Sequence, residues 1–178
     1  VENVDGVILD LRNNGGGGLD ESINMAGLFI GLNPVVIVRQ SGGRRVTVHR
    51  SRERVVYTGP LVVLLNRYSA SASEILAGAM HDFQRALLVG DTTTFGKGTV
   101  QNIFQLPEGY GALKVTIAQF YRVSGWSTQN RGVETSIVLP SLNNAREIGE
   151  STLDNALPWR SIDQVSYRPK GNFKTVLP

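Results

Sequence analysis

The chain of 178 residues contains no cysteine, only two histidines, and no long apolar run. The missing cysteines exclude disulfides and thiolate metal sites. His49 and His81 alone leave little scope for a zinc site, so we expect no metal and no other cofactor. No stretch of about 18 or more apolar residues exists, so we expect no segment to span a membrane.

Charge is also modest, with a formal net charge of +3 and 19% charged residues. The basic residues are scattered and no basic stripe carries interleaved aromatics, which argues against a nucleic-acid partner. A hydrophobic content of 41% is enough for one domain with a buried core. The chain begins without an initiator Met or a signal-peptide pattern, so we expect it to be a piece of a longer protein.

A strand–loop–helix pattern occurs twice. Residues 7–11 form an apolar run of strand length, four glycines follow at 15–18, and residues 19–31 have helical apolar spacing. Residues 61–65 form the next buried-strand candidate, and a helix is predicted from Ser71 or Ser73 to about Phe83. Parallel strands joined by helices place their following loops on one sheet edge. We therefore expect the glycine loop and the serine turn to lie side by side.

The remaining segments predict a mixed α/β fold. Further strands are expected at 35–38, 86–89, 99–106 and 112–121. Residues 46–56, with three arginines among valines, are typical of an exposed hairpin or edge ribbon. We expect residues 1–140 to form the core and residues 141–178 to be a peripheral C-terminal segment. In that segment only Leu157 and Trp159 look able to anchor it.

The serine turn, residues 69–74, admits two functions. A serine just before a helix presents its hydroxyl beside unpaired backbone N–H groups, which can bind a developing negative oxygen. The same pattern, Ser71 with Glu74 three residues later, fits a capping box in which Glu74 reaches back. The pattern by itself favours the cap over a catalytic serine.

The glycine run and a glycine-flanked lysine raise similar alternatives. Backbone N–H groups at residues 15–18 could supply half of an oxyanion hole or cradle a phosphate, or the run could be a plain flexible turn. It does not match a phosphate loop, because Leu19-Asp20 follows instead of Lys and Ser or Thr. Lys97 lies between two glycines beside a core strand, a setting for a base, although most lysines are solvated.

Three motifs in order give a specific resemblance. They are Ser-Ala-Ser-Ala-Ser-Glu at 69–74, Phe-Gly-Lys-Gly-Thr-Val-Gln at 95–101, and Leu-Asp-Leu-Arg-Asn-Asn-Gly-Gly-Gly at 9–17. Together they resemble the carboxyl-terminal processing or tail-specific proteases, which are S41-type serine peptidases. Residues 120–125 and 154–159 are more similar to the periplasmic tail-specific branch than to the plastid-type branch.

The resemblance implies an α/β fold with a core similar to the crotonase and Clp protease folds, plus an extra β ribbon. It implies a serine endopeptidase of the Ser/Lys type. Ser71 would be the nucleophile and Lys97 the general base. Gln101 would orient the lysine, and the backbone N–H groups of Gly17 and Ala72 would form the oxyanion hole.

Asp82 matches an aspartate that is sometimes counted as a third catalytic member of the family. Eleven residues separate it from Ser71, which is about 16 Å along a straight helix. We therefore expect a supporting role, and the same distance argues against a catalytic His81. The loop before Lys97 is one residue longer than the family pattern, Asp91-Thr92-Thr93-Thr94-Phe95-Gly96-Lys97, which could shift the base.

The partners implied by the resemblance are polypeptide substrates with exposed C-terminal tails and, in the full-length protein, a lipoprotein adaptor. The implied location is the periplasm. The family recognises tails with an upstream PDZ domain that this chain does not contain, so we expect weak or unregulated activity from the chain alone. Two alternatives stay open: a catalytically silent scaffold of the same fold, and a crotonase-like acyl-CoA enzyme, which would have no need of the Ser71 and Lys97 pair.

Overall fold

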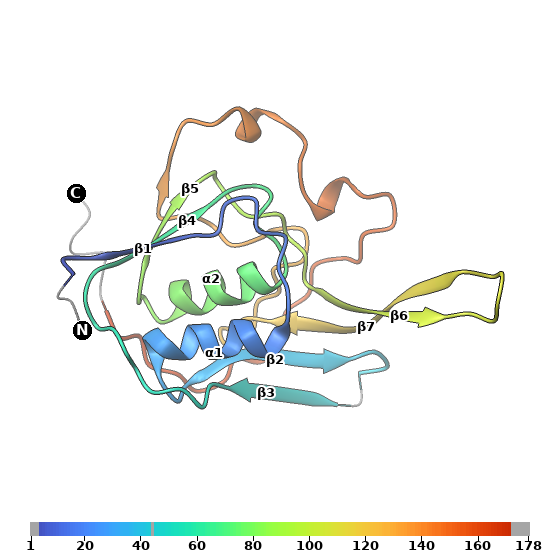
Figure 1. The fold of residues 1–178 in the computed structure, drawn as a ribbon, viewed down its shortest axis with the longest axis horizontal. Coiled ribbons are helices and arrows are strands. Elements are labelled where there is room, and N and C mark those ends of the chain that lie inside the picture. The colour runs from blue at the N-terminus through green and yellow to red at the C-terminus, as the bar shows by residue number, and fades with distance from the viewer. Residues whose placement is uncertain (1–3, 44, 172–178) are drawn as a thin grey trace.

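The computed structural model describes residues 4–43 and 45–171, which form two four-stranded sheets with two helices between them (Figure 1). One sheet is parallel, with strand order β1-β4-β5-β8. The other is antiparallel, with order β3-β2-β7-β6. The expected mixed α/β fold is confirmed. No helix in the described ranges is long and apolar enough to cross a bilayer.

The parallel sheet and the helices contain both predicted strand–loop–helix units. Their bounds are β1 (Val7–Asp10), α1 (Leu19–Ile30), β4 (Leu61–Leu65), α2 (Ala72–Asp82), β5 (Leu87–Gly90) and β8 (Ile137–Val138). The register pairs Val7 with Leu61 and Val62 with Leu87, so the carboxyl ends of β1 and β4 lie at one edge. The loops after these strands therefore meet, as expected. Strand β8, with two residues, was not predicted.

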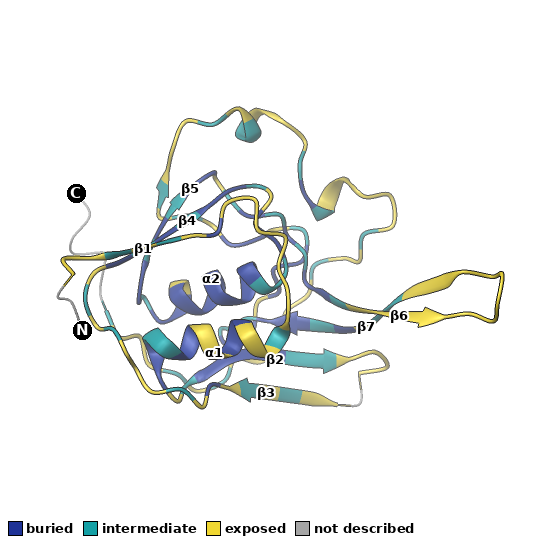
Figure 2. Cartoon of the chain, viewed as in Figure 1, coloured by how far each residue is buried: buried dark blue, intermediate teal, exposed yellow. Residues whose placement is uncertain are grey.

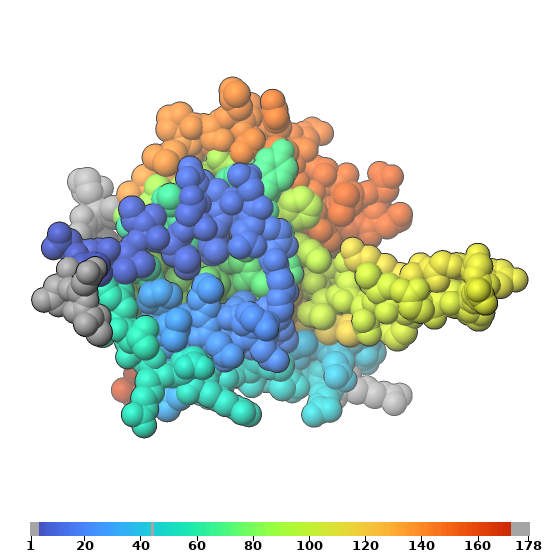
Figure 3. All heavy atoms as spheres, in the orientation of Figure 1, coloured from blue at the N-terminus to red at the C-terminus, as the bar shows by residue number. Residues whose placement is uncertain are grey.

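The antiparallel sheet contains β2 (Pro34–Gln40), β3 (Val46–Arg50), β6 (Thr99–Gln105) and β7 (Ala112–Tyr121). The β6–β7 hairpin extends beyond the body of the molecule (Figures 1 and 3). The predicted ribbon at 46–56 is wrong in its second half. Strand β3 ends at Arg50 and pairs with β2, and the chain then crosses α1, where Val56 N–H donates to the Leu28 carbonyl at 2.9 Å.

The core lies around α2, which is buried along almost its whole length (Figure 2). Met80 and Phe83 have no exposed surface, and neither do Val63 and Leu65 of the overlying β4. Full burial of each such side chain contributes about 1.5–3 kcal/mol. Helix α2 is thus fixed between the sheets, and its first residue follows Ser71.

The C-terminal segment is anchored at two places. Trp159 donates its indole N–H to the Ser127 carbonyl at 2.9 Å, and the Arg131 guanidinium lies 3.8 Å above its ring. Leu157 holds the chain through its carbonyl, which accepts from Gln129 Nε2 at 3.1 Å, while its side chain is exposed. Leu157 therefore anchors the segment through its backbone carbonyl and not through its side chain.

The segment is also anchored further along the chain, at residues 165–167, and this was not predicted from the sequence. The Tyr167 ring lies 5.4 Å from the Phe83 ring at the C-terminal end of α2. Val165 also packs against the core, and its N–H donates to the Val123 carbonyl at 3.0 Å. Among the described residues of this segment, the only helical turns are two short 3-10 turns, Leu142–Ala145 and Glu150–Thr152.

Candidate active site

The glycine loop and the serine turn are joined by hydrogen bonds. The Asn14 carbonyl accepts from Ala70 N–H and from Ser73 Oγ, both at 3.0 Å. Ser69 Oγ donates to the Leu11 carbonyl at 2.8 Å. Each contact spans more than 50 residues of sequence, so the expected adjacency of the two loops is confirmed.

Gly16 makes the closest approach between the two loops. Its φ is +103°, and a Cβ there would lie 2.8 Å from the Ala70 carbonyl oxygen and from Ser71 Cβ. Because a side chain would be strained by the backbone and blocked by the neighbouring turn, only glycine fits this position. The glycine loop therefore packs directly against the Ser71 turn.

Ser71 itself has a strained backbone, with φ 56° and ψ −114°. A residue other than glycine in this region costs on the order of 1–3 kcal/mol, and such residues cluster at active sites. The serine lies at a sharp strand-to-helix turn between β4 and α2, the geometry that exposes a nucleophile in hydrolases of other folds. The Glu74 half of the predicted capping box is present as well, since Glu74 Oε2 accepts from Ser71 N–H at 2.8 Å.

Two backbone N–H groups beside Ser71 are available to a ligand. In the part of the chain that the structure describes, neither Ala72 N–H nor Gly17 N–H makes a hydrogen bond. The Gly16 N–H is already bonded to Asn14 Oδ1 at 3.0 Å. This difference favours Gly17 over Gly16 as an oxyanion donor.

A cavity of about 240 Å³ brings the predicted site residues together. It is lined by Gly17, Leu19, Ser71, Ala72, Ile75, Lys97, Thr99, Val100, Gln101, Ile103, Lys114 and Phe120. The serine, the lysine, the glutamine and both predicted oxyanion donors therefore line one cavity. Both residues line the cavity, and among the described residues no hydrogen bond joins the Ser71 hydroxyl to the Lys97 amine.

Glu74 links the serine turn to the lysine loop. Its carboxylate accepts from the backbone N–H groups of Ser71 (2.8 Å), Gly96 (2.7 Å) and Lys97 (2.9 Å), and from Thr94 Oγ1 (2.5 Å). Burial raises the pKa of this fully enclosed carboxyl to about 7, although the four hydrogen bonds act in the opposite direction. The lengthened loop before Lys97 is thus tied directly to the serine turn.

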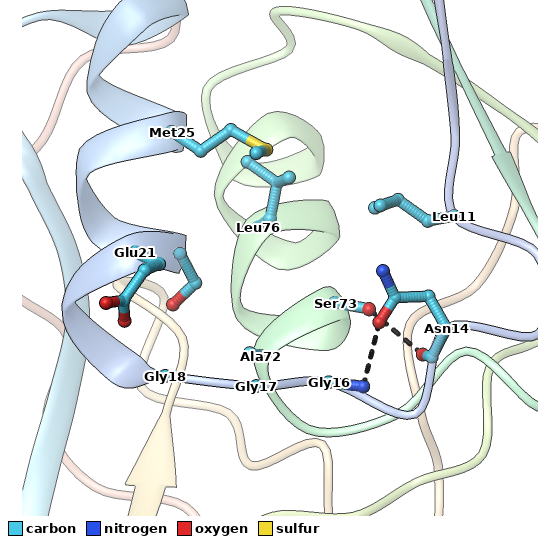
Figure 4. Close-up of a pocket in the computed structure, with 11 residues that line it drawn as sticks. Leu11, Asn14, Gly16, Gly17, Gly18, Glu21, Met25, Ala72, Ser73 and Leu76 are labelled. Carbon is cyan, nitrogen blue, oxygen red and sulfur yellow. Dashed lines mark hydrogen bonds between the residues drawn. The ribbon is translucent and has the colours of Figure 1, made fainter.

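A smaller cavity of about 140 Å³ is lined by the glycine loop and the start of α2 (Figure 4). Leu11, Met25 and Leu76 form its apolar part, and Gly17 and Ala72 line both this cavity and the larger one. A ligand oxygen bound by the Gly17 and Ala72 N–H groups would therefore lie next to the small apolar cavity. Its size suits one apolar side chain.

Asp82 lies at the opposite end of α2 from Ser71. It pairs with Arg122, which also contacts His81, and it accepts from Ser124 Oγ at 3.2 Å. Burial raises the pKa of Asp82, but the His81 and Arg122 contacts outweigh burial and hold the pKa below its usual value. These contacts place Asp82 and His81 in a separate polar cluster, outside the Ser71 cavity.

His49 lies in the edge strand β3, away from the other candidates. The described ranges contain no group of three or more His, Asp or Glu side chains that could hold a metal ion. Three residues near the site were missed from the sequence: Thr99, Lys114, and Glu74 in its bridging role. Only Thr99 had a usable signal, since Lys97, Thr99 and Gln101 alternate with the strand period of two.

The two sheets with two helices between them place the chain among mixed α/β proteins, and the strained Ser71 turn lies beside its cavity. A solved structure of a photosystem II D1 C-terminal processing protease superposes with a TM-score of 0.68 at 37% identity, over 76% of this chain and 35% of that one. The chain belongs to peptidase family S41, whose model matches residues 1–139. A model described as the C-terminal domain of tail specific protease matches residues 143–178.

Curated relatives agree with this assignment. A tail-specific protease of Haemophilus influenzae is 45% identical over 98% of this chain and 26% of its own length. A chloroplastic C-terminal processing peptidase of Tetradesmus obliquus is 38% identical over 78% of this chain and 29% of its own. The chain thus spans between a quarter and a third of the length of these relatives.

Proposed function

We propose that this chain is the catalytic part of a serine endopeptidase in which Ser71 and Lys97 form a dyad. The observation that carries the proposal is the strained Ser71 backbone beside two unpartnered N–H groups, in one cavity with Lys97. Residues with strained backbones cluster at active sites, so the strain at Ser71 supports a chemical role for its side chain. Membership of peptidase family S41 supports the same reaction class.

In this proposal Ser71 Oγ attacks the carbonyl carbon of the scissile peptide bond. Its proton moves to the Lys97 amine, and the carbonyl oxygen becomes an oxyanion held by the N–H groups of Gly17 and Ala72. The Lys97 ammonium then returns the proton to the leaving amine. A water molecule then takes the place of the departed amine, and Lys97 activates it to hydrolyse the acyl-enzyme on Ser71. Asp82 acts only by supporting α2.

The substrate class we propose is a polypeptide with an exposed C-terminal tail. The names of the Haemophilus and Tetradesmus relatives support it. The apolar cavity in Figure 4 is suited to the side chain next to the scissile bond. A periplasmic location and a lipoprotein adaptor for the full-length protein belong to the same proposal and rest on the likeness to tail-specific proteases.

A second candidate, a catalytically silent scaffold, is favoured by the missing hydrogen bond between Ser71 and Lys97. One experiment separates the two candidates. We expect the full-length protein to hydrolyse an unfolded protein carrying an apolar C-terminal tail, and we expect Ser71→Ala and Lys97→Ala each to lower the rate at least about 10³-fold. Equal, background rates for all three proteins would establish the scaffold, and normal activity of Lys97→Ala would refute the dyad.

A further inference from the structure

Thr99, the first residue of β6, carries a buried hydroxyl without a partner. Its exposed fraction is 4%, and its Oγ1 makes no hydrogen bond to any residue in the described ranges. Burying an unpaired hydroxyl costs stability, so such groups are few in folded proteins. Thr99 also lines the cavity that holds Ser71 and Lys97. Thr99 therefore holds a buried, unpaired oxygen in the wall of the cavity where the proposed reaction occurs.

Lys97, Thr99, Val100 and Gln101 all line this cavity where the chain enters β6. Side chains two residues apart in extended chain point to one face. The backbone between them is fixed, because Gly98 N–H donates to Gln129 Oε1 at 2.9 Å. The register shifts between Val100 and Gln101, and both residues line the cavity.

We propose that Thr99 is a positioning residue for Lys97, accepting one N–H of its amine on Oγ1. This inference rests on the proposed Ser71–Lys97 dyad. A neutral lysine amine has two N–H bonds and one lone pair. If Thr99 Oγ1 accepts one N–H and the Gln101 amide oxygen accepts the other, the lone pair is left for the Ser71 hydroxyl.

The same arrangement serves the charged state of the lysine. When the Ser71 oxygen bonds to the substrate carbon, its proton forms the third N–H bond of Lys97. Thr99 and Gln101 keep the first two N–H groups, so the third is the one passed to the leaving amine. The other charged side chain of the cavity, Lys114, has no acceptor oxygen and cannot replace Thr99.

A merely structural role predicts a different outcome from a positioning role. Valine has the shape and strand preference of threonine, so Thr99→Val removes the hydroxyl with little change in packing. Since that hydroxyl is unpaired in the fold, its loss should leave the melting temperature unchanged or slightly raised. Thr99→Ser keeps the hydroxyl and loses a methyl group.

The experiment measures kcat, KM and melting temperature for the full-length enzyme and its variants on one tailed protein substrate. We expect Thr99→Val to lower kcat about 10- to 100-fold with KM within about twofold, and Thr99→Ser to restore most of kcat. A matched control is Thr135→Val, whose hydroxyl does have a partner, the Asp91 carbonyl at 2.8 Å. It should lower the melting temperature by about 3 °C and leave kcat unchanged.

Normal kcat in Thr99→Val would overturn the inference, as would a loss that Thr99→Ser does not restore. So would a loss of kcat that merely accompanies a lower melting temperature. Ser71→Ala and Lys97→Ala are measured alongside. If they abolish hydrolysis while Thr99→Val does not slow it, the positioning role fails and the dyad stands. If they too retain activity, the proposed function itself fails.

Discussion

At the scale of single residues, Glu74 combines two demands that oppose each other. Its carboxylate is completely buried, which favours the neutral form, yet it accepts four hydrogen bonds, which favours the charged form. Its pKa of about 7 lies above the usual 4.5, so the folded protein holds the proton more tightly than the unfolded chain does. Its contribution to stability is therefore fully present below about pH 4.5 and is lost as pH rises through about 7.

Glu74→Gln should remove this pH dependence. From pH 5 to pH 8 we expect the free energy of unfolding of the unmodified protein to fall by about 2 kcal/mol relative to that of the variant. The variant should be less stable overall, because its amide N–H₂ faces backbone donors. Urea melts of both proteins at several pH values give the comparison. Parallel curves would mean that burial does not raise the Glu74 pKa.

Single residues could be placed from the sequence only where a motif named them. Ser71, Lys97, Gly17, Ala72 and Gln101 were predicted from the resemblance, and the structure brings all five into one cavity. Their catalytic roles stay a prediction. The Glu74 bridge could not be foreseen, because it joins backbone groups 20 or more residues away and depends on how the lysine loop folds back.

At the scale of elements, the site depends on the contact between the glycine loop and the start of α2. Gly16→Ala would place a Cβ 2.8 Å from the Ala70 carbonyl in a positive-φ conformation, so the loop must move away from Ser71. We expect a loss of about 2 kcal/mol in stability and at least about a tenfold loss of peptide hydrolysis, measured by thermal melts and initial rates.

The control for that substitution is in the same loop. A Cβ on Gly15 would have no neighbour within 4 Å, and its φ is not positive. Gly15→Ala should therefore retain stability and activity within about twofold. Equal effects of the two substitutions would show that the close approach at Gly16 does not set the site.

Elements with strong periodicity or apolar runs were predictable. The helices at Leu19–Ile30 and Ala72–Asp82 and the strands around them follow from local pattern. Two features were not. Strand β8 has only two residues, and it is defined by its parallel pairing with the edge of β5 and not by a local sequence pattern. Residues 51–56 carry valines but form no strand in the structure. Instead Val56 bonds to Leu28 near the end of α1, a tertiary contact that local sequence does not reveal.

At the scale of the whole molecule, the C-terminal segment packs on the same core as the rest of the chain. We propose the boundary near residue 140 as the junction between a peptidase core and a peripheral segment, and the two family matches on either side support it. The Phe83–Tyr167 contact nevertheless ties this segment to the end of α2. The two parts are expected to unfold together.

Tyr167→Ala tests this coupling. Losing a half-buried aromatic contact should cost about 1–2 kcal/mol. Hydrogen exchange should then increase both in residues 160–171 and at the C-terminal turn of α2. Faster exchange in the C-terminal segment alone would show that it is only loosely attached. The exposed Tyr110 at the tip of the β6–β7 hairpin provides the control, since Tyr110→Ala should change neither region.

In the proposed function Ser71 is a nucleophile activated by Lys97. The most direct measurement is the site and rate of covalent labelling by an organophosphonate, followed by peptide mass spectrometry of the full-length protein. We expect a single adduct on Ser71, formed at least about 100-fold more slowly in Lys97→Ala. An adduct on another residue, or an unchanged rate in Lys97→Ala, would contradict it.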